Sequence, residues 1–296
     1  MIPFIIGFIS GTLIILAVYS VESAKYKKTT YYKDKKVSLI RILTNKGANG
    51  EYQTYKMLMK YEKQGAKFLF NCYLPAQKDK TSEVDVIMIY KSGIYVLESK
   101  NYSGWIFGNE SDKKWTQTLN AGKRVHKEHF YNPIMQNQTH IKWLRELLKS
   151  EISFDITPFS LIVFSERCKL KNITNTNPLV KVINRYDILK EISVYDNMVG
   201  TVVSDEMVDK IYSLLKPYTE VDDATKQKHI DNINDRYKES DNSVLSEKQT
   251  TVTNEDEVCP RCGAKLVLRT AQKGENAGKQ FYGCSSYPKC RYIKNI

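Results

Sequence analysis

The chain has 296 residues, of which 42% are hydrophobic and 26% are charged. This length and composition are ordinary for a globular protein of one or two domains, and they exclude a chain too short or too polar to bury a core. The formal net charge of +12 predicts an acidic partner, either a nucleic acid or an anionic membrane surface.

The N-terminal run at 4–21 contains 18 residues without a charge. At about 1.5 Å per residue, this run just spans a hydrocarbon core of about 30 Å. A signal peptide should have basic residues before the run, and a buried helix should keep a polar face. We therefore predict a transmembrane helix at 4–21, which would be the protein's contact with the membrane.

A basic juxtamembrane segment is predicted at 22–45, because six lysines follow the apolar run: Lys25, Lys27, Lys28, Lys33, Lys35 and Lys36. The positive-inside rule then predicts a single-pass protein of the cell membrane with its main domains in the cytoplasm. The lysines could also contact anionic lipid headgroups, although setting the topology is sufficient to explain them.

A mixed α/β domain is predicted at 46–218, with strands that first pair antiparallel and then alternate with helices. The helix after Asn132-Pro133 has an asparagine cap and a proline in its first position. The predicted elements are, in chain order, a helix at 46–65, a strand at 67–74, a hairpin at 83–100, a strand at 104–108 with its return partner near Trp115, a helix at 132–150, strands at 160–164 and 180–183, and helices at 186–192 and 205–215.

The hairpin at 83–100 carries the residues that point to chemistry. Asp85 opens its first strand, and Glu98 and Lys100 close the second on one shared face. Two carboxylates and a lysine at a sheet edge could hold a divalent ion and orient or deprotonate a water molecule. The alternative is an ordinary solvated ion pair at a strand end, and Glu83 could replace Asp85 as a ligand.

A polar linker is predicted at 219–257, where glycine and proline are absent and apolar residues are few, with helix persisting through Tyr237. The segment at 258–296 contains Cys259, Cys262, Cys284 and Cys290, two close pairs of cysteines separated by a hairpin-length spacer. This spacing and a cytoplasmic location favour a four-thiolate zinc site over disulfides.

The cysteine segment resembles the zinc ribbons at the C-terminal end of type IA DNA topoisomerases. The resemblance includes Phe281-Tyr282 and Tyr287-Pro288 as well as the cysteines. It implies binding of single-stranded DNA, which agrees with the basic and aromatic side chains of this segment. A ribbon that only docks a protein partner is the alternative.

Residues 47–150 resemble the nuclease-related domain called NERD. The resemblance rests on Gly50-Glu51, Glu83-x-Asp85, the segment at 93–101, Gly104-Trp105, and the ordered set Asn132-Pro133, Gln136 and His140. It implies a restriction-endonuclease-like, PD-(D/E)xK mixed sheet flanked by helices, beside the small zinc ribbon and the N-terminal transmembrane helix.

The resemblance to NERD also implies the roles of the site residues. Asp85 and Glu98 would bind Mg²⁺ or Mn²⁺, Lys100 would position the water molecule, and Glu51 and Gln136 would reach the site from two helices. His140 either joins the site or packs on a helix face near Trp143, and the second interpretation is favoured. His126 and His129 lie in a lysine-rich stretch that we interpret as a solvated loop rather than a phosphate contact.

These features predict a membrane-anchored nuclease that hydrolyses phosphodiester bonds in nucleic acid, with DNA favoured over RNA, and binds it through the ribbon. The alternative from another class is a non-catalytic scaffold that tethers DNA to the membrane. A third hypothesis is a regulatory module that recruits a protein partner through the ribbon.

Overall fold

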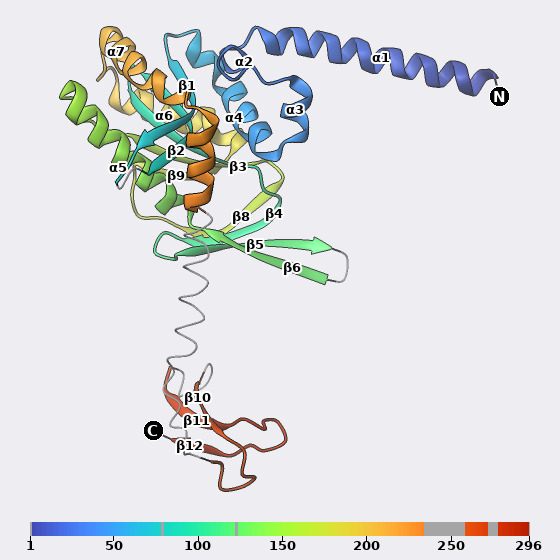
Figure 1. The fold of residues 1–296 in the computed structure, drawn as a ribbon, viewed down its shortest axis with the longest axis vertical. Coiled ribbons are helices and arrows are strands. Elements are labelled where there is room, and N and C mark those ends of the chain that lie inside the picture. Colours follow the sequence, from blue (N-terminus) through green and yellow to red (C-terminus); the bar gives the residue numbers. More distant parts are fainter. Residues whose placement is uncertain (1, 78–79, 122–123, 234–257, 272–277, 296) are drawn as a thin grey trace. The chain divides into compact units, whose positions relative to one another are not determined.

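The computed structural model describes residues 2–77, 80–121, 124–233, 258–271 and 278–295. The chain separates into two compact units, Met1–His229 and Ile230–Ile296, and each is described by itself. Figure 1 shows the elements of both units.

The first unit begins with three helices, α1 (Ile2–Lys27), α2 (Thr30–Lys35) and α3 (Leu39–Thr44). The predicted transmembrane helix at 4–21 lies within α1, and the side chains of residues 2–12 are outside the described part. Among the described residues, no helix is both long and apolar enough to cross a bilayer, so the structure gives this prediction no support.

The central sheet of the first unit has five strands in the order β1-β2-β3-β7-β9. The first three strands pair antiparallel, and β3, β7 and β9 pair in parallel. The mixed sheet predicted from the sequence is therefore confirmed. The strands are β1 (Lys67–Pro75), β2 (Thr81–Tyr90), β3 (Gly93–Lys100), β7 (Phe159–Phe164) and β9 (Val180–Asn184).

Helices cover both faces of this sheet (Figure 1). One face packs against α4 (Lys46–Glu62) and α6 (Ile188–Val199), which follows a short 3₁₀ turn at Arg185–Asp187. The other face packs against α5 (Pro133–Ile152) and α7 (Asp205–Leu215), which continues into a 3₁₀ turn at Lys216–Thr219. The resulting three layers enclose two apolar cores, one on each side of the strands.

The segment at 22–45, predicted as a basic juxtamembrane stretch, contributes to the first of these cores. Tyr26, Tyr31 and Ile42 are at most 1% exposed and pack with side chains of α4 and β1. Aromatic side chains of this size stabilise a core by the apolar area that they bury. The lysines of this segment therefore alternate with residues that belong to the folded unit.

A second sheet of four strands, in the order β6-β5-β4-β8, lies between β3 and α5 in the sequence and is completed by β8. Its strands are β4 (Gly104–Asn109), β5 (Lys114–Ala121), β6 (Arg124–Tyr131) and β8 (Cys168–Thr174). The interpretation of the stretch around His126 and His129 as a loop was wrong, because this stretch forms β6 and pairs with β5 along its whole length. Residues Val125–His129 are all exposed, so no buried face marks the strand in the sequence.

The second unit contains a three-stranded antiparallel sheet of β10 (Leu266–Thr270), β11 (Gln280–Cys284) and β12 (Ile293–Asn295). A helical stretch covers residues 223–233 of the predicted linker. The rest of the predicted linker, including Tyr237, lies outside the described residues.

Candidate functional site

The candidate site lies where β2 and β3 separate. Their antiparallel ladder ends with the pair Val86 and Leu97. One residue further along, the Asp85 carboxylate accepts a hydrogen bond of 2.8 Å from the Ser99 backbone N–H. The Asp85 side chain thus takes the place of the next backbone hydrogen bond between β2 and β3. We call the point where the two strands separate the fork, and Asp85 and Glu98 lie on its two strands.

Glu98 is the most enclosed acidic group of the site, with 2% of its side chain exposed. Its Oε1 lies 2.7 Å from Lys100 Nζ, and its Oε2 lies 3.3 Å from His140 Nε2. The Nδ1 of His140 is 2.7 Å from the Ser82 hydroxyl. His140, whose site role the sequence left open, therefore lies against Glu98, and β2 holds its ring in place.

Gln136 lies in the first turns of α5, and its side-chain oxygen accepts a hydrogen bond of 3.1 Å from Lys100 Nζ. The position of α5 is set at its start, where the Asn132 side chain accepts a hydrogen bond of 2.9 Å from the Ile134 N–H. This is the cap predicted from the sequence. One helix therefore delivers both Gln136 and His140 to the β3 end that carries Glu98 and Lys100.

Glu51 reaches the edge of the site from α4 on the opposite face of the sheet. Its Oε2 accepts hydrogen bonds from the Asn71 side-chain amide at 3.1 Å and from the Tyr31 hydroxyl at 3.3 Å. Asn71 has a φ of 47°, and it interrupts the pairing of β1 with β2. This uncommon backbone conformation turns the Asn71 amide out of the ladder, where it holds the Glu51 carboxylate.

The charged groups of the site shift one another's pKa values. Burial, followed by the negative charges of Glu98 and Glu51, raises the pKa of Asp85 well above its usual range. Burial also raises the pKa of Glu98, but Lys100 and His140 outweigh this effect and lower that pKa to about 2. The pKa values of the two carboxyl groups are therefore shifted in opposite directions.

Lys100 remains a cation at neutral pH. Burial disfavours its charged form, but the carboxylates of Glu98 and Asp85 outweigh burial and raise the pKa of Lys100. A permanent ammonium can bind a phosphate oxygen or orient a water molecule, but it cannot remove a proton from that water.

The carboxyl groups of Asp85 and Glu98 offer oxygen atoms, the ligand type that a hard divalent cation prefers. Glu98 Oε2 is buried, and within the described residues it has no partner in hydrogen-bond geometry. Oxygen ligands of this kind suit Mg²⁺ or Mn²⁺, and a cation would favour the ionised form of both carboxyl groups. Two carboxylates fill only part of an octahedral shell, so water or substrate oxygens would have to supply the remaining positions.

Glu83, the alternative to Asp85, has different partners. Its Oε1 accepts a hydrogen bond of 2.9 Å from the Tyr73 hydroxyl, and its Oε2 lies 3.7 Å from His229 Nε2. Sequence reasoning missed Tyr31, Asn71 and Ser82 as partners of site residues. An asparagine inside an apolar strand was the only one of these with a signal, because asparagine disfavours strands.

The second unit presents the four cysteines as a metal site. The sulfur atoms of Cys259, Cys262, Cys284 and Cys290 all lie within 4.8 Å of one another. A tetrahedral zinc ion with bonds of about 2.3 Å requires sulfur atoms about 3.8 Å apart. The separations of 3.7 Å for Cys259 and Cys290 and 3.3 Å for Cys262 and Cys284 fit this geometry. The Ala264 N–H lowers the pKa of Cys262 to about 7, which favours the thiolate that zinc binds.

Basic and aromatic side chains surround the cysteines. The Arg269 guanidinium lies 5.8 Å from the centre of the Tyr287 ring, and 61% of Tyr287 is exposed. A hollow next to the cysteines is lined by Arg261, Lys289 and Arg291. Cations beside an exposed ring suit a strand of phosphates and unpaired bases.

Comparison with known proteins finds two families in the chain. Residues 46–165 match the nuclease-related domain, NERD, and residues 256–296 match the topoisomerase DNA-binding C4 zinc finger. No solved structure matches the chain.

Curated relatives resemble one or the other part of the chain. An uncharacterized protein of Bacillus anthracis is 33% identical over 128 residues, which cover 43% of this chain and 57% of that protein. DNA topoisomerase 1 of Methanocaldococcus jannaschii is 51% identical over 49 residues, 17% of this chain and 6% of the topoisomerase. An uncharacterized protein of Escherichia coli is 48% identical over 46 residues, 16% of this chain and 22% of that protein. Residues 46–165 are thus similar to the nuclease-related domain, and residues 256–296 are similar to the topoisomerase-type C4 zinc ribbon.

Proposed function

We propose that the protein is a metal-dependent nuclease whose zinc ribbon binds single-stranded nucleic acid, with DNA favoured. The observation that carries the proposal is the convergence of Glu98, Lys100, Gln136 and His140 beside the fork at Asp85. The match to the nuclease-related domain supports it, and the restriction-endonuclease-like fold implied by the resemblance fits the mixed sheet.

Each residue of the site has a role in this proposal. Asp85 and Glu98 would hold Mg²⁺ or Mn²⁺, which when bound supplies Lewis-acid activation of water and phosphate. Lys100 remains charged and, held by Gln136, directs its ammonium toward a phosphate oxygen or the attacking water. His140 keeps Glu98 oriented, because Ser82 fixes the other side of its ring. Glu51 adds a carboxylate at the site's edge.

The proposal is tested by cleavage of DNA and RNA by the purified full-length chain with Mg²⁺ or Mn²⁺. Glu98→Ala should reduce cleavage by at least about a hundredfold, because it removes one of two metal carboxylates and the carboxylate that lies 2.7 Å from Lys100 Nζ. Glu146→Ala is the matched control, since Glu146 is an exposed acid of α5 and should leave cleavage unchanged. Glu98→Gln repeats the test with nearly the same side-chain volume.

Equal cleavage by the wild type and both Glu98 variants would contradict the assignment of the site. Salt-dependent binding without turnover on any substrate or with either metal would instead favour the non-catalytic scaffold.

We also propose that α1 anchors the protein in the cell membrane, with the main domains in the cytoplasm. This proposal rests on the charge-free run at 4–21 and the lysines that follow it. Large apolar side chains between Leu13 and Val21 are 52–68% exposed, and a bilayer would cover them. Retention of the full chain in the membrane pellet after alkaline extraction would agree with the proposal, and its release would contradict it.

A further inference from the structure

The four-stranded sheet has two different faces. Its inner face packs Ile106, Trp115, Phe130 and Leu170 into an apolar core. The register places two rows of side chains on the opposite face, which we call the outer sheet face: Trp105, Thr118, Lys127 and Lys169 in one row, and Phe107, Thr116, His129 and Lys171 in the next.

The outer sheet face combines exposed aromatic and basic groups. Trp105 is 43% exposed, and the Lys171 ammonium lies 5.8 Å from the centre of its ring. Phe107 packs its ring edge-to-face with Trp105, at 6.5 Å between the centroids. An exposed tryptophan on an interior strand of a sheet is unusual unless something binds there.

The charge of the outer sheet face identifies the kind of partner. Lys127, Lys169 and Lys171 are exposed, and neither described row contains an acidic residue. Three lysines across two rows attract a chain of phosphates, while a flat exposed ring offers a stacking surface to an unpaired base. Bases of a duplex are already stacked on their neighbours, so this combination suits a single strand better than a duplex.

The outer sheet face is attached to the candidate site at both ends. Only residues 101–103 separate Lys100 from β4, and Asn132 alone separates β6 from α5, which carries Gln136. Strands β4, β5 and β6 thus form an insertion between Lys100 and α5, both of which contribute to the site. A nucleic-acid strand bound along this sheet would therefore lie close to the site in the sequence.

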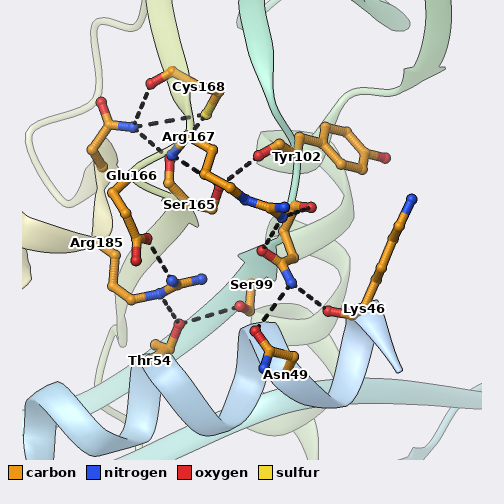
Figure 2. A network of polar contacts seen from close by, with 12 residues as sticks. Lys46, Asn49, Thr54, Ser99, Tyr102, Ser165, Glu166, Arg167, Cys168 and Arg185 are labelled. Atoms are coloured by element: carbon orange, nitrogen blue, oxygen red, sulfur yellow. Dashed lines mark hydrogen bonds and ion pairs between the residues drawn. The ribbon is translucent and has the colours of Figure 1, made fainter. Parts of the chain in front are cut away.

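A polar network fixes the sheet against the site (Figure 2). The Asn101 amide donates a hydrogen bond of 2.7 Å to the Lys46 carbonyl, at the start of α4. Arg167, just before β8, donates hydrogen bonds of 3.1 Å and 2.8 Å to the Asn101 backbone and side-chain oxygens. The Ser165 hydroxyl donates to the Tyr102 carbonyl. These bonds join α4, the connection from β3 to β4, and the connection from β7 to β8.

We propose that the outer sheet face binds single-stranded nucleic acid and guides it to the candidate site. The guiding of nucleic acid to the site rests on the proposed nuclease function. The binding of nucleic acid to the outer sheet face does not depend on cleavage. It assigns Trp105 as the stacking residue and Lys169 and Lys171 as phosphate contacts.

Tryptophan fluorescence can measure this binding apart from the ribbon, because the three tryptophans are Trp105, Trp115 and Trp143, and none lies in the ribbon. The full chain is titrated with an unlabelled single-stranded oligonucleotide in buffer without added Mg²⁺ or Mn²⁺. We expect quenching in the wild type and loss of most of that quenching in Trp105→Phe, because Trp115 is fully buried and Trp143 packs on α5 against the core of the central sheet.

The charge test is a double substitution, Lys169→Glu with Lys171→Glu. It should weaken the fluorescence-reported affinity at least tenfold and reduce the slope of log K against log salt by about 1.4, since each phosphate contact to a single strand contributes about 0.7. The matched control is Lys190→Glu with Lys210→Glu, two exposed lysines of α6 and α7 with the same total charge change. The control pair should change affinity by less than twofold.

Absence of quenching in the wild type, or equal effects of the two lysine pairs, would overturn the proposal whatever the protein cleaves. A wild type that binds through Trp105 and never cuts would leave this surface in place and contradict the proposed nuclease function. Tighter binding of a duplex than of a single strand would also overturn the assignment of the ligand.

Discussion

At the scale of single residues, the candidate site depends on how the charges of four buried groups are balanced. Lys100 and His140 favour the ionised form of Glu98, whereas burial and the nearby carboxyl groups of Glu98 and Glu51 raise the pKa of Asp85. Pairs of acidic groups with widely separated pKa values are typical of sites that bind cations or transfer protons.

Glu51 gives this balance a measurable effect on stability. Burial raises its pKa to about 7, against which the Asn71 amide acts only in part. At pH values between the ordinary pKa of a glutamate and about 7, Glu51 is protonated in the folded chain and ionised in the unfolded chain. Raising the pH across this window therefore lowers the free energy of unfolding. Glu51→Gln should remove that loss, which is at most about 3 kcal/mol, and make the variant more stable than the wild type at pH 8.

The measurement is urea unfolding of the full-length wild type and variant, without added Mg²⁺ or Mn²⁺, at pH 5 and pH 8. Glu62→Gln is the control, because Glu62 is a second α4 acid that accepts a bond from Tyr55 and lies at the other end of the helix. A Glu51→Gln variant with the same pH dependence as the wild type would contradict the elevated pKa.

The sequence could predict residues that share a local pattern and could not predict those that meet only after folding. Glu98 and Lys100 are two positions apart on one strand, so strand geometry alone places them on one face. Tyr31 meets Glu51 because α2 packs beside α4, and no periodicity in the sequence encodes that contact. His140 stayed ambiguous for the same reason, since its partner Ser82 belongs to a distant strand.

At the scale of elements, the second sheet shows where pattern reading fails. Strand β4 was predicted because Ile106 and Phe107 are apolar and Gly104 precedes them, whereas β6 was not. Residues Val125–His129 are exposed, so the segment has no alternation of buried and exposed side chains that would predict a strand. It forms a strand because it pairs with β5. Helices α5 and α7 were predicted well because Asn132 and Ser204 cap them through local hydrogen bonds.

Gly104 is the residue that allows β4 to lie against β5. It has a φ of 78°, and a Cβ atom there would lie 2.3 Å from the Thr118 carbonyl oxygen. Gly104→Ala should therefore lower the free energy of unfolding by more than about 2 kcal/mol, because both the backbone conformation and the close contact are lost.

Chemical denaturation measures this effect, and Gly47→Ala is its control. Gly47 lies in the first turn of α4, where the nearest atom to a new Cβ is a side-chain oxygen at 3.4 Å. That variant should be neutral or more stable by up to about 1 kcal/mol. Equal stability of the two variants would show that β4 can shift to accept a side chain at position 104.

At the scale of the whole molecule, the folded unit is larger than the region that matches the nuclease-related domain. The match begins at residue 46, yet Tyr26, Tyr31 and Ile42 fill part of the core. The Tyr31 ring lies 4.8 Å from Phe70 and 6.2 Å from Tyr55, measured between ring centres. The lysines of 22–45 predict a juxtamembrane segment, and the apolar residues between them make this segment part of the folded unit as well.

Tyr31→Ala should therefore lower the free energy of unfolding by about 3–5 kcal/mol, as expected for loss of a fully buried aromatic ring. Tyr186→Ala removes the same side chain at a position that is 63% exposed and should cost less than about 1 kcal/mol. Denaturant unfolding of both full-length variants compares them directly. A small effect at Tyr31 would mean that the helices before residue 46 are not part of the cooperative unit.

The parallel pairing of β3 with β7 also governs when the site can form during synthesis. Tyr95 pairs with Phe159 and Lys100 pairs with Phe164, so the second strand emerges from the ribosome well after the first. The intervening segment contains α5, which supplies Gln136 and His140. Because closing such a long loop precedes the contacts that repay it, we expect the parallel pairing of β3 with β7, which completes the sheet beside Glu98, to form late. The nascent chain should thus acquire its candidate site only as a late step of folding.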